Sequence, residues 1–164
     1  MNNTIWLIGR PCAGKTTISE AIKHNAIRLD GDVLRKGLNS DLGFSIEDRS
    51  ENLRRVAEIS KIFNDNGHDV ICSFVTPCEL QRRLLASINP CINFVNVYCS
   101  LEIAIKRDVK GMYKKALRGE IKDFTGIDSV YEEPLQSILK LDTETQTIQV
   151  CAAILTNYIK WCKK

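Results

Sequence analysis

The chain has 164 residues, a length typical of one domain with a full α/β core. Its formal net charge of +3 is too small to indicate a nucleic-acid-binding protein by itself. Apolar runs are too short to cross a bilayer, and residues 1–4 do not resemble a signal peptide. Seven cysteines without a Cys-x-x-Cys spacing indicate small buried residues of a reducing compartment. We therefore expect a single soluble cytoplasmic domain, residues 1–164, that binds neither a nucleic-acid polymer nor a membrane.

Strand-like and helix-like segments alternate along the chain. The predicted strands cover Ile5–Ile8, Ala26–Leu29, Asp69–Phe74, Asn93–Cys99 and Ile138–Leu141. The predicted helices cover Lys15–Lys23, Asp48–Asn66, Glu79–Ala86, Leu101–Arg107 and about Gln146–Trp161. This alternation predicts an α/β fold in which a doubly wound, parallel, five-stranded sheet is flanked by helices.

Residues Gly9 to Thr16 (GRPCAGKT) form a phosphate-binding loop motif between the first predicted strand and the first predicted helix. A loop of this spacing turns its backbone N–H groups toward phosphates at a helix N-terminus. Lys15 would reach the outer phosphates of ATP, and the Thr16 hydroxyl would be a ligand of Mg²⁺. The expected ATP-binding residues are Gly9, Ala13, Gly14, Lys15, Thr16 and Thr17. A chance match on a glycine-bearing turn is the alternative, and the flanking strand and helix argue against it.

Two carboxylates, Asp30 and Asp32, follow the second predicted strand. Ligands of an open parallel sheet gather at the carboxyl ends of its strands, where the phosphate loop also lies. Phosphoryl transfer needs a group that takes the proton of the acceptor hydroxyl. Asp32 is the candidate for that role, and Asp30 could orient a Mg²⁺-bound water. The alternative for Asp30 is a capping role at a helix that opens near Val33.

Arg35, Arg49 and Asn52 are candidate contacts to an anionic substrate. Arg49 and Asn52 are three residues apart, so they share one helix face. A forked guanidinium suits a phosphate or a sulfate. For Arg49, an ion pair with Glu47 or Glu51 at the surface is an equally supported alternative.

Phe44 and Phe124 are aromatic residues in polar, glycine-containing loops, where they could hold a nucleobase between them. The alternative is that each fills the core. Phe124 lies in the segment Lys110–Pro134, which breaks the strand–helix alternation and resembles a mobile lid over a nucleotide site. We call residues 110–134 the lid segment. A basic run borders it, typical of a solvated helix face: Lys106, Arg107, Lys110, Lys114 and Lys115.

Together these segments resemble the adenylylsulfate kinases over nearly the whole chain and in the same order. The segments that carry the resemblance are Leu29–Asn39, Asp41–Ser45, Asp48–Arg55, Phe74–Pro77, Arg107–Gly111, Lys122–Asp128 and Tyr131–Pro134. The chain departs from the family pattern at Pro11 and Cys12, where the family usually has Ser-Gly, and in a shorter first helix.

The resemblance implies a homodimeric enzyme that uses ATP to phosphorylate the 3′-hydroxyl of adenosine 5′-phosphosulfate (APS), a small-molecule nucleotide. It implies that Asp32 is the catalytic carboxylate. It also implies substrate contacts from Arg35, Phe44, Arg49, Asn52, Val75, Thr76, Lys122, Phe124 and Asp128. A family offshoot that phosphorylates cytidine 5′-diphosphoramidate in the same way is an open alternative. A non-catalytic nucleotide switch and a small-metabolite kinase are weaker alternatives.

Overall fold

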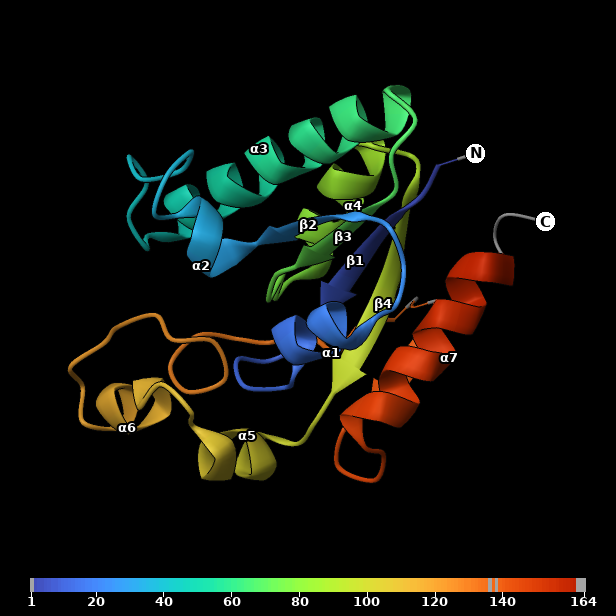
Figure 1. Ribbon diagram of the computed structural model, residues 1–164. Helices are drawn as coiled ribbons and strands as arrows, with labels where there is room; N and C mark the ends of the chain where they lie inside the picture. Colours follow the sequence, from blue (N-terminus) through green and yellow to red (C-terminus); the bar gives the residue numbers. More distant parts are fainter. Residues whose placement is uncertain (1, 136, 138, 162–164) are drawn as a thin grey trace.

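The computed structural model describes residues 2–135, 137 and 139–161, and its centre is a sheet of five parallel strands (Figure 1). The strands are β1 (Thr4–Ile8), β2 (Ile27–Asp30), β3 (Val70–Ser73), β4 (Ile92–Tyr98) and β5 (Leu139–Asp142). Their order in the sheet is β2-β3-β1-β4-β5. The predicted doubly wound parallel sheet is confirmed. The expected first residue of the last strand, Ile138, lies outside the described residues.

Helices cover both faces of the sheet (Figure 1). They are α1 (Lys15–Ala21), α2 (Gly31–Leu34), α3 (Ile46–Asp65), α4 (Glu79–Ile88), α5 (Leu101–Arg107), α6 (Met112–Leu117) and α7 (Ile148–Trp161). Helices α3 and α4 pack together on one face, and α1 and α7 pack together on the other. Among the described helices, none combines the length and apolarity that a membrane span requires.

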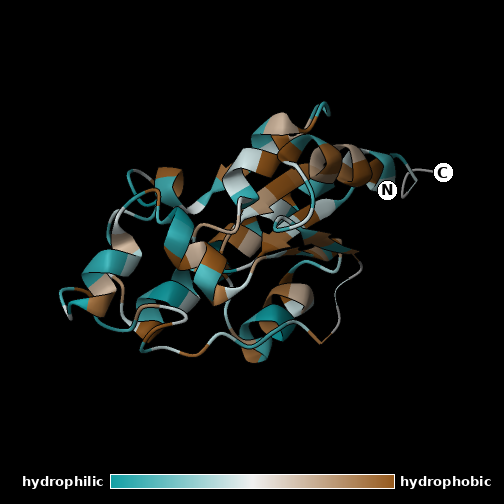
Figure 2. Cartoon of the chain, turned by 90° about the horizontal axis from the view of Figure 1, so that it is seen from below, coloured by the Kyte–Doolittle hydropathy of each residue, from teal (hydrophilic) through white to brown (hydrophobic). Residues whose placement is uncertain are grey.

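The central strand β1 supplies both layers of the core because alternate side chains of a strand point to opposite faces. Ile5 and Leu7 join the cluster under α1 and α7, whereas Trp6 and Ile8 join the cluster under α3 and α4. All five residues of β1 are buried, as expected for a strand covered on both faces. Figure 2 shows the hydrophobic colour on much of the sheet, whereas hydrophobic and hydrophilic residues alternate along the helices.

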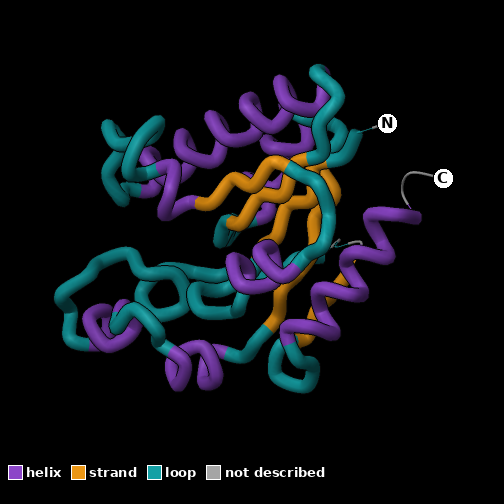
Figure 3. The backbone as a smooth tube through the Cα atoms, in the orientation of Figure 1, coloured by secondary structure: helices purple, strands orange, loops and turns teal. Residues whose placement is uncertain are grey.

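Helix α6 was missed by the sequence patterns, α2 was expected only in the alternative in which Asp30 caps a helix near Val33, and one helix begins earlier than expected. The four-residue α2 follows Asp30 directly, and α6 lies inside the lid segment. Helix α3 begins at Ile46, two residues before the predicted start, because the Ser45 hydroxyl caps it by accepting the N–H of Asp48 at 3.0 Å. After α6 the chain continues as a long loop toward β5 (Figure 3).

The site lies where the strand order reverses. The chain passes from β1 over β3 to β2, and later from β3 over β1 to β4, so β1 and β3 flank the switch point. The phosphate loop follows β1, Val75 and Thr76 follow β3, and Asp30 ends β2. The sheet therefore brings three predicted site segments to one edge.

Candidate active site

The phosphate loop (residues 9–16) is shaped by close backbone approaches. A Cβ on Gly9 would lie 2.2 Å from the carbonyl oxygen of Val97, so this position excludes any side chain. The N–H of Gly9 donates to the carbonyl of Val75 at 3.4 Å, which ties the loop to the end of β3. Gly14, at φ 100°, precedes α1 in a left-handed conformation that glycine adopts without strain. The loop is therefore fixed on the strands before any ligand binds.

Lys15 folds back across the phosphate loop. Its Nζ donates to the carbonyl oxygens of Gly9 and Arg10, each at 2.8 Å. Burial lowers the pKa of the Lys15 ammonium to about 8. The ammonium is thus bound by backbone dipoles rather than by a carboxylate, and a phosphate is a better partner for it.

Thr16, Asp30 and Asp32 form a group of oxygen atoms beside the phosphate loop. The Thr16 hydroxyl donates to Asp30 Oδ2 at 2.7 Å. The other Asp30 oxygen accepts the N–H of Asp32 at 2.9 Å and so caps α2. Asp30 therefore has the capping role that was weighed against a functional one, and it also faces Thr16. Hydroxyl and carboxylate oxygens are the ligands that Mg²⁺ prefers, so this group fits that ion.

Asp32 is 66% exposed in its side chain and forms an ion pair with Lys110, the first residue of the lid segment. The hydrogen bond to Asp32 raises the pKa of the Lys110 ammonium. The carboxylate is accessible from solvent and lies against the lid. This is the location that a proton acceptor for a lid-covered substrate requires.

Arg107 and Thr143 hold the phosphate loop from the side opposite Asp30, and neither was predicted as a site residue. Arg107 Nη1 donates to the Thr143 hydroxyl at 2.9 Å. That hydroxyl lies 3.0 Å from the carbonyl oxygen of Ala13 in the loop. Arg107 is half-buried. The prediction that the basic run is a solvated face was therefore wrong at this residue, because the guanidinium turns inward to the loop.

Arg35 and Arg49 lie close together at the mouth of the site. Burial and the nearby positive charge of Arg49 lower the pKa of Arg35. Arg35 Nη1 donates to the Gly43 carbonyl at 2.6 Å, and Arg49 Nη1 donates to the Asp123 carbonyl of the lid segment at 2.6 Å. Among the described residues, the hydrogen bonds of these two neighbouring guanidinium groups go to carbonyls, so both groups can take an anion.

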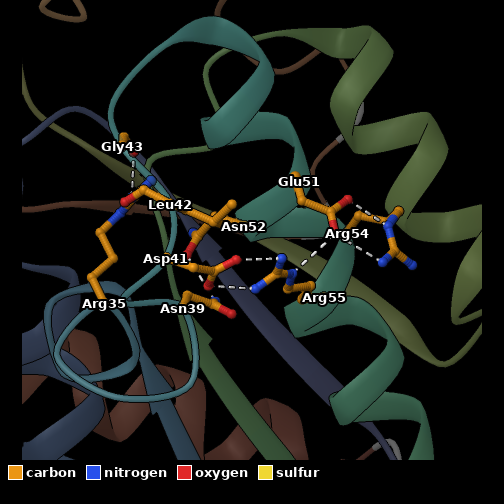
Figure 4. Close-up of polar contacts among 9 residues, drawn as sticks. All are labelled: Arg35, Asn39, Asp41, Leu42, Gly43, Glu51, Asn52, Arg54 and Arg55. Atoms are coloured by element: carbon orange, nitrogen blue, oxygen red, sulfur yellow. Dashed lines mark hydrogen bonds and ion pairs between the residues drawn. The ribbon is translucent and has the colours of Figure 1, made fainter.

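Among the described residues, Arg49 pairs with neither Glu47 nor Glu51, the two partners that its alternative expectation named; Glu51 has other partners. Its carboxylate accepts from Arg54 at 2.7 Å and from Arg55 at 3.0 Å, and these bonds hold the pKa of Glu51 at about 2 (Figure 4). Arg55 also forms a two-pronged ion pair with Asp41, at 2.8 Å for each bond. These pairs fix the loop before α3. Arg49 takes no part in them and donates to the lid segment instead.

Asn52 is 4% exposed and accepts from Asn39 Nδ2 at 2.9 Å (Figure 4). Asn39 is fully buried, and its own amide oxygen has no hydrogen-bond partner among the described residues. The predicted site residue Asn52 therefore also supports the loop after α2. Asn39 was missed as its partner because nothing in the local spacing pairs residues on a loop and a later helix.

The two phenylalanines differ in their surroundings. Phe44 is 66% exposed and lies under the Arg35 guanidinium, with 4.6 Å from the guanidinium carbon to the ring centre. Phe124 is 7% exposed and packs edge-on against Tyr113 of α6, with ring centres 4.9 Å apart. Phe44 is thus available for stacking, whereas Phe124 fills the core in this conformation, as its alternative expectation described.

The remaining predicted substrate residues lie at β3 and in the lid segment. Thr76 is buried, and its hydroxyl accepts from Trp6 Nε1 at 2.9 Å, so its side chain supports the strand end and leaves the backbone at the site. Asp128 accepts the N–H groups of Asp123 at 2.8 Å and Phe124 at 2.5 Å, which closes a turn of the lid segment. Lys122 is exposed on the same turn.

A parallel sheet with a phosphate loop after its first strand, and with carboxylates at the end of its second strand, defines a phosphate-loop kinase. A family model described as adenylylsulphate kinase matches residues 1–142. The chain therefore belongs to the adenylylsulfate kinase family, and the resemblance seen in the sequence is confirmed.

Relatives and a solved structure agree with this assignment. The adenylyl-sulfate kinase of Saccharomyces bayanus is 42% identical over 167 residues, which cover 95% of this chain and 83% of that protein. The adenylyl-sulfate kinase of Pseudomonas entomophila is 43% identical over 166 residues, covering 95% and 79%. The structure of the Mycobacterium tuberculosis APS kinase in complex with AMPPNP and APS is similar at a TM-score of 0.93. It is 34% identical, over 97% of this chain and 98% of that one.

Proposed function

We propose that this protein transfers the γ-phosphoryl group of ATP to the 3′-hydroxyl of adenosine 5′-phosphosulfate. The observation that carries the proposal is the meeting of the phosphate loop, the Asp30–Asp32 carboxylates and the Arg35–Arg49 pair at one sheet edge. Membership in the adenylylsulfate kinase family supports it independently.

On the donor side, the Lys15 ammonium gives up its hydrogen bonds to the Gly9 and Arg10 carbonyls and binds the outer phosphates of ATP. Loop N–H groups and the N-terminus of α1 bind the remaining phosphate oxygens. The Thr16 hydroxyl and Asp30 would hold Mg²⁺, which neutralises charge on the phosphates when it is bound. Transfer breaks the bond between the γ-phosphorus and its bridging oxygen, and ADP leaves.

On the acceptor side, Arg35 and Arg49 hold the anionic 5′ end of the nucleotide, and Phe44 offers a ring to the base. The 3′-oxygen forms the new bond to phosphorus, and its proton passes to Asp32. Because Lys110 pairs with Asp32 in the present arrangement, the ammonium has to move aside or turn to the transferred phosphoryl group.

A panel of acceptors tests the proposal. The pure protein is incubated with ATP, Mg²⁺ and one acceptor at a time, namely APS, cytidine 5′-diphosphoramidate, shikimate or gluconate, and ADP is measured. We expect ADP with APS. Stacking on Phe44 accepts either base, so the cytidine nucleotide is the informative comparison. ADP formation with a sugar acid alone, or with no acceptor at all, would contradict the proposal.

Further properties belong to the same proposal. We infer one domain in which residues 110–134 act as a lid, since this segment contacts both Asp32 and Arg49. Free thiols at all six described cysteines support a cytoplasmic location. The exposed Leu80 and Leu84 lie one turn apart on α4 and support a homodimer, which analytical ultracentrifugation can test.

A further inference from the structure

Arg10, the second residue of the phosphate loop, reaches the far end of the lid segment. Its guanidinium carbon lies 4.4 Å from the centre of the Tyr131 ring, and its Nη2 lies 3.0 Å from Oε1 of Glu133. The Arg10 side chain is only 18% exposed. A cation over an aromatic ring is held more strongly when water is excluded. One residue of the donor-binding loop therefore binds the last part of the lid directly.

The other contacts of this last part of the lid segment go to different elements. Arg82 donates to the Glu132 carbonyl, and the Glu132 carboxylate accepts the N–H of Glu79 at 2.6 Å, so α4 holds the backbone next to Tyr131. Near the start of the lid segment, Tyr113 donates to the Pro11 carbonyl at 3.1 Å. Arg10 thus adds a link between the phosphate loop and the end of the lid, complementing the Tyr113 link near its start.

The backbone of Arg10 is also a partner of Lys15. The Arg10 carbonyl accepts from Lys15 Nζ at 2.8 Å. When Lys15 turns to the phosphates of a bound nucleotide, this carbonyl loses the ammonium and keeps the N–H of Ala13, at 3.2 Å, as a donor. Donor binding therefore acts on the same residue whose side chain holds Tyr131 and Glu133.

The guanidinium keeps unused bonding capacity. Arg10 lines a cavity of about 320 Å³ together with Leu101 and residues 126–131. Its Nε and Nη1 are buried, and neither has a hydrogen-bond partner among the described residues; the same holds for the Tyr131 hydroxyl. Buried donors without an acceptor cost free energy. The link between Arg10 and Tyr131 is therefore formed with unsatisfied polar atoms on both sides.

We propose that Arg10 is a positioning residue that couples the conformation of the phosphate loop to closure of the lid segment. The inference rests on the proposed function only in placing the acceptor nucleotide beneath the lid. Its structural part, the dependence of lid order on Arg10, stands apart from any catalytic activity.

Hydrogen–deuterium exchange of the whole protein tests that structural part. Arg10→Met keeps the apolar stem and removes the charge. Arg118→Met is the matched control, because Arg118 lies in the lid segment but is 60% exposed and pairs locally with Glu120 at 3.7 Å. We expect Arg10→Met to raise exchange across residues 123–134 by about tenfold, with the β1 and β3 amides unchanged. Arg10→Lys should restore part of the protection, and Arg118→Met should leave it at the wild-type level.

A second variant addresses the lid side of the contact. Glu133 is 48% exposed, so Glu133→Gln should fold normally and raise exchange in the same residues. Combined with Arg10→Met it should add little, because both changes remove one contact. Equal exchange in wild type, Arg10→Met and Glu133→Gln would overturn the proposal.

The kinetic readout separates positioning from structure. We expect Arg10→Met to raise the acceptor KM by about tenfold while kcat changes by less than about threefold, as for a lost binding arrangement. An unchanged acceptor KM in an active Arg10→Met enzyme would contradict the coupling. If the wild-type protein phosphorylates no nucleotide, the proposed function fails, and the exchange measurement still decides whether Arg10 orders the lid.

Discussion

At the scale of single residues, Lys15 has the most specific electrostatic consequence. Its ammonium is buried, and its pKa lies at about 8 in the ligand-free protein. Bound phosphates favour the charged form and raise that pKa, so nucleotide binding takes up a proton at pH values between about 8 and the higher pKa of the complex. Affinity for ATP should therefore be constant below about pH 7.5 and fall as the pH rises further.

Calorimetric titration with an ATP analogue and Mg²⁺ between about pH 7 and 9.5 checks this dependence. Above the free-protein pKa, log Kd should rise with a slope that approaches about one per pH unit. Lys15→Met should bind weakly and without this pH dependence. Constant affinity of the wild type over the whole range would show that Lys15 remains charged in the empty loop.

A second prediction for a single residue concerns Asp32 as the proton acceptor. Asp32→Asn keeps the size of the side chain and removes its basicity, so kcat should fall by about 10²–10⁴-fold. The affinity for ATP should stay within about twofold, since Thr16 and Asp30 pair without Asp32. Asp65→Asn, at the far end of α3, is the control and should be fully active. Retention of most activity by Asp32→Asn would remove Asp32 from the mechanism.

At the scale of elements, the start of α3 is held to the loop after α2 by one buried amide pair. Asn52→Ala leaves the amide of the fully buried Asn39 without its partner. The free energy of unfolding should drop by about 1–3 kcal/mol, and the acceptor KM should rise. Asn157→Ala on the exposed side of α7 should change stability by less than about 0.5 kcal/mol. Urea denaturation of both variants measures the difference, and equal midpoints would refute the structural role of the pair.

Substitution of the two phenylalanines by alanine should have different effects on stability and on acceptor binding. Phe44 is exposed, so Phe44→Ala should change stability by no more than about 1 kcal/mol and should weaken acceptor binding. Phe124 is buried against Tyr113, so Phe124→Ala should destabilise the protein by about 3–5 kcal/mol. Thermal unfolding and acceptor KM together separate the two roles. A stable Phe124→Ala variant with a raised acceptor KM would show that Phe124 leaves the core to stack on the base.

Elements with strong local signals could be predicted, and those held by tertiary contacts could not. The start of α1 at Lys15 and both limits of α5 follow from the phosphate-loop motif and from the apolar period. Helix α6 was missed because its six residues carry little periodicity, and it is capped from outside by Asp108, which accepts the N–H groups of Tyr113 and Lys114 at 3.0 Å each. The inward turn of Arg107 likewise depends on Thr143, 36 residues away.

The same distinction holds for the site. The place of the phosphate loop between β1 and α1 could be predicted because one contiguous motif encodes it. On the acceptor side, the residue types were suggested by spacing and resemblance. Their partners, such as Asn39 for Asn52 and Asp123 for Arg49, come from other elements, and no local pattern encodes those pairings.

At the scale of the whole molecule, the lid segment is bound by two predicted site residues, Asp32 and Arg49, and by Arg10 of the phosphate loop. Lys110 forms an ion pair with Asp32, and the Asp123 carbonyl accepts a hydrogen bond from Arg49. At the end of the lid segment, Glu133 forms an ion pair with Arg10. If these residues bind the substrates as proposed, each binding event would change what holds the lid segment. In the proposed function, the acceptor would therefore compete with the lid segment for the same charged groups.

The most direct test of the central claim is identification of the product formed from ATP, Mg²⁺ and APS by the wild-type protein. Mass spectrometry and ³¹P NMR should show one ADP for each APS that acquires a 3′-phosphate, and kcat/KM should be higher for APS than for cytidine 5′-diphosphoramidate. ADP release without a 3′-phosphorylated nucleotide, or phosphorylation of the cytidine nucleotide alone, would contradict the account.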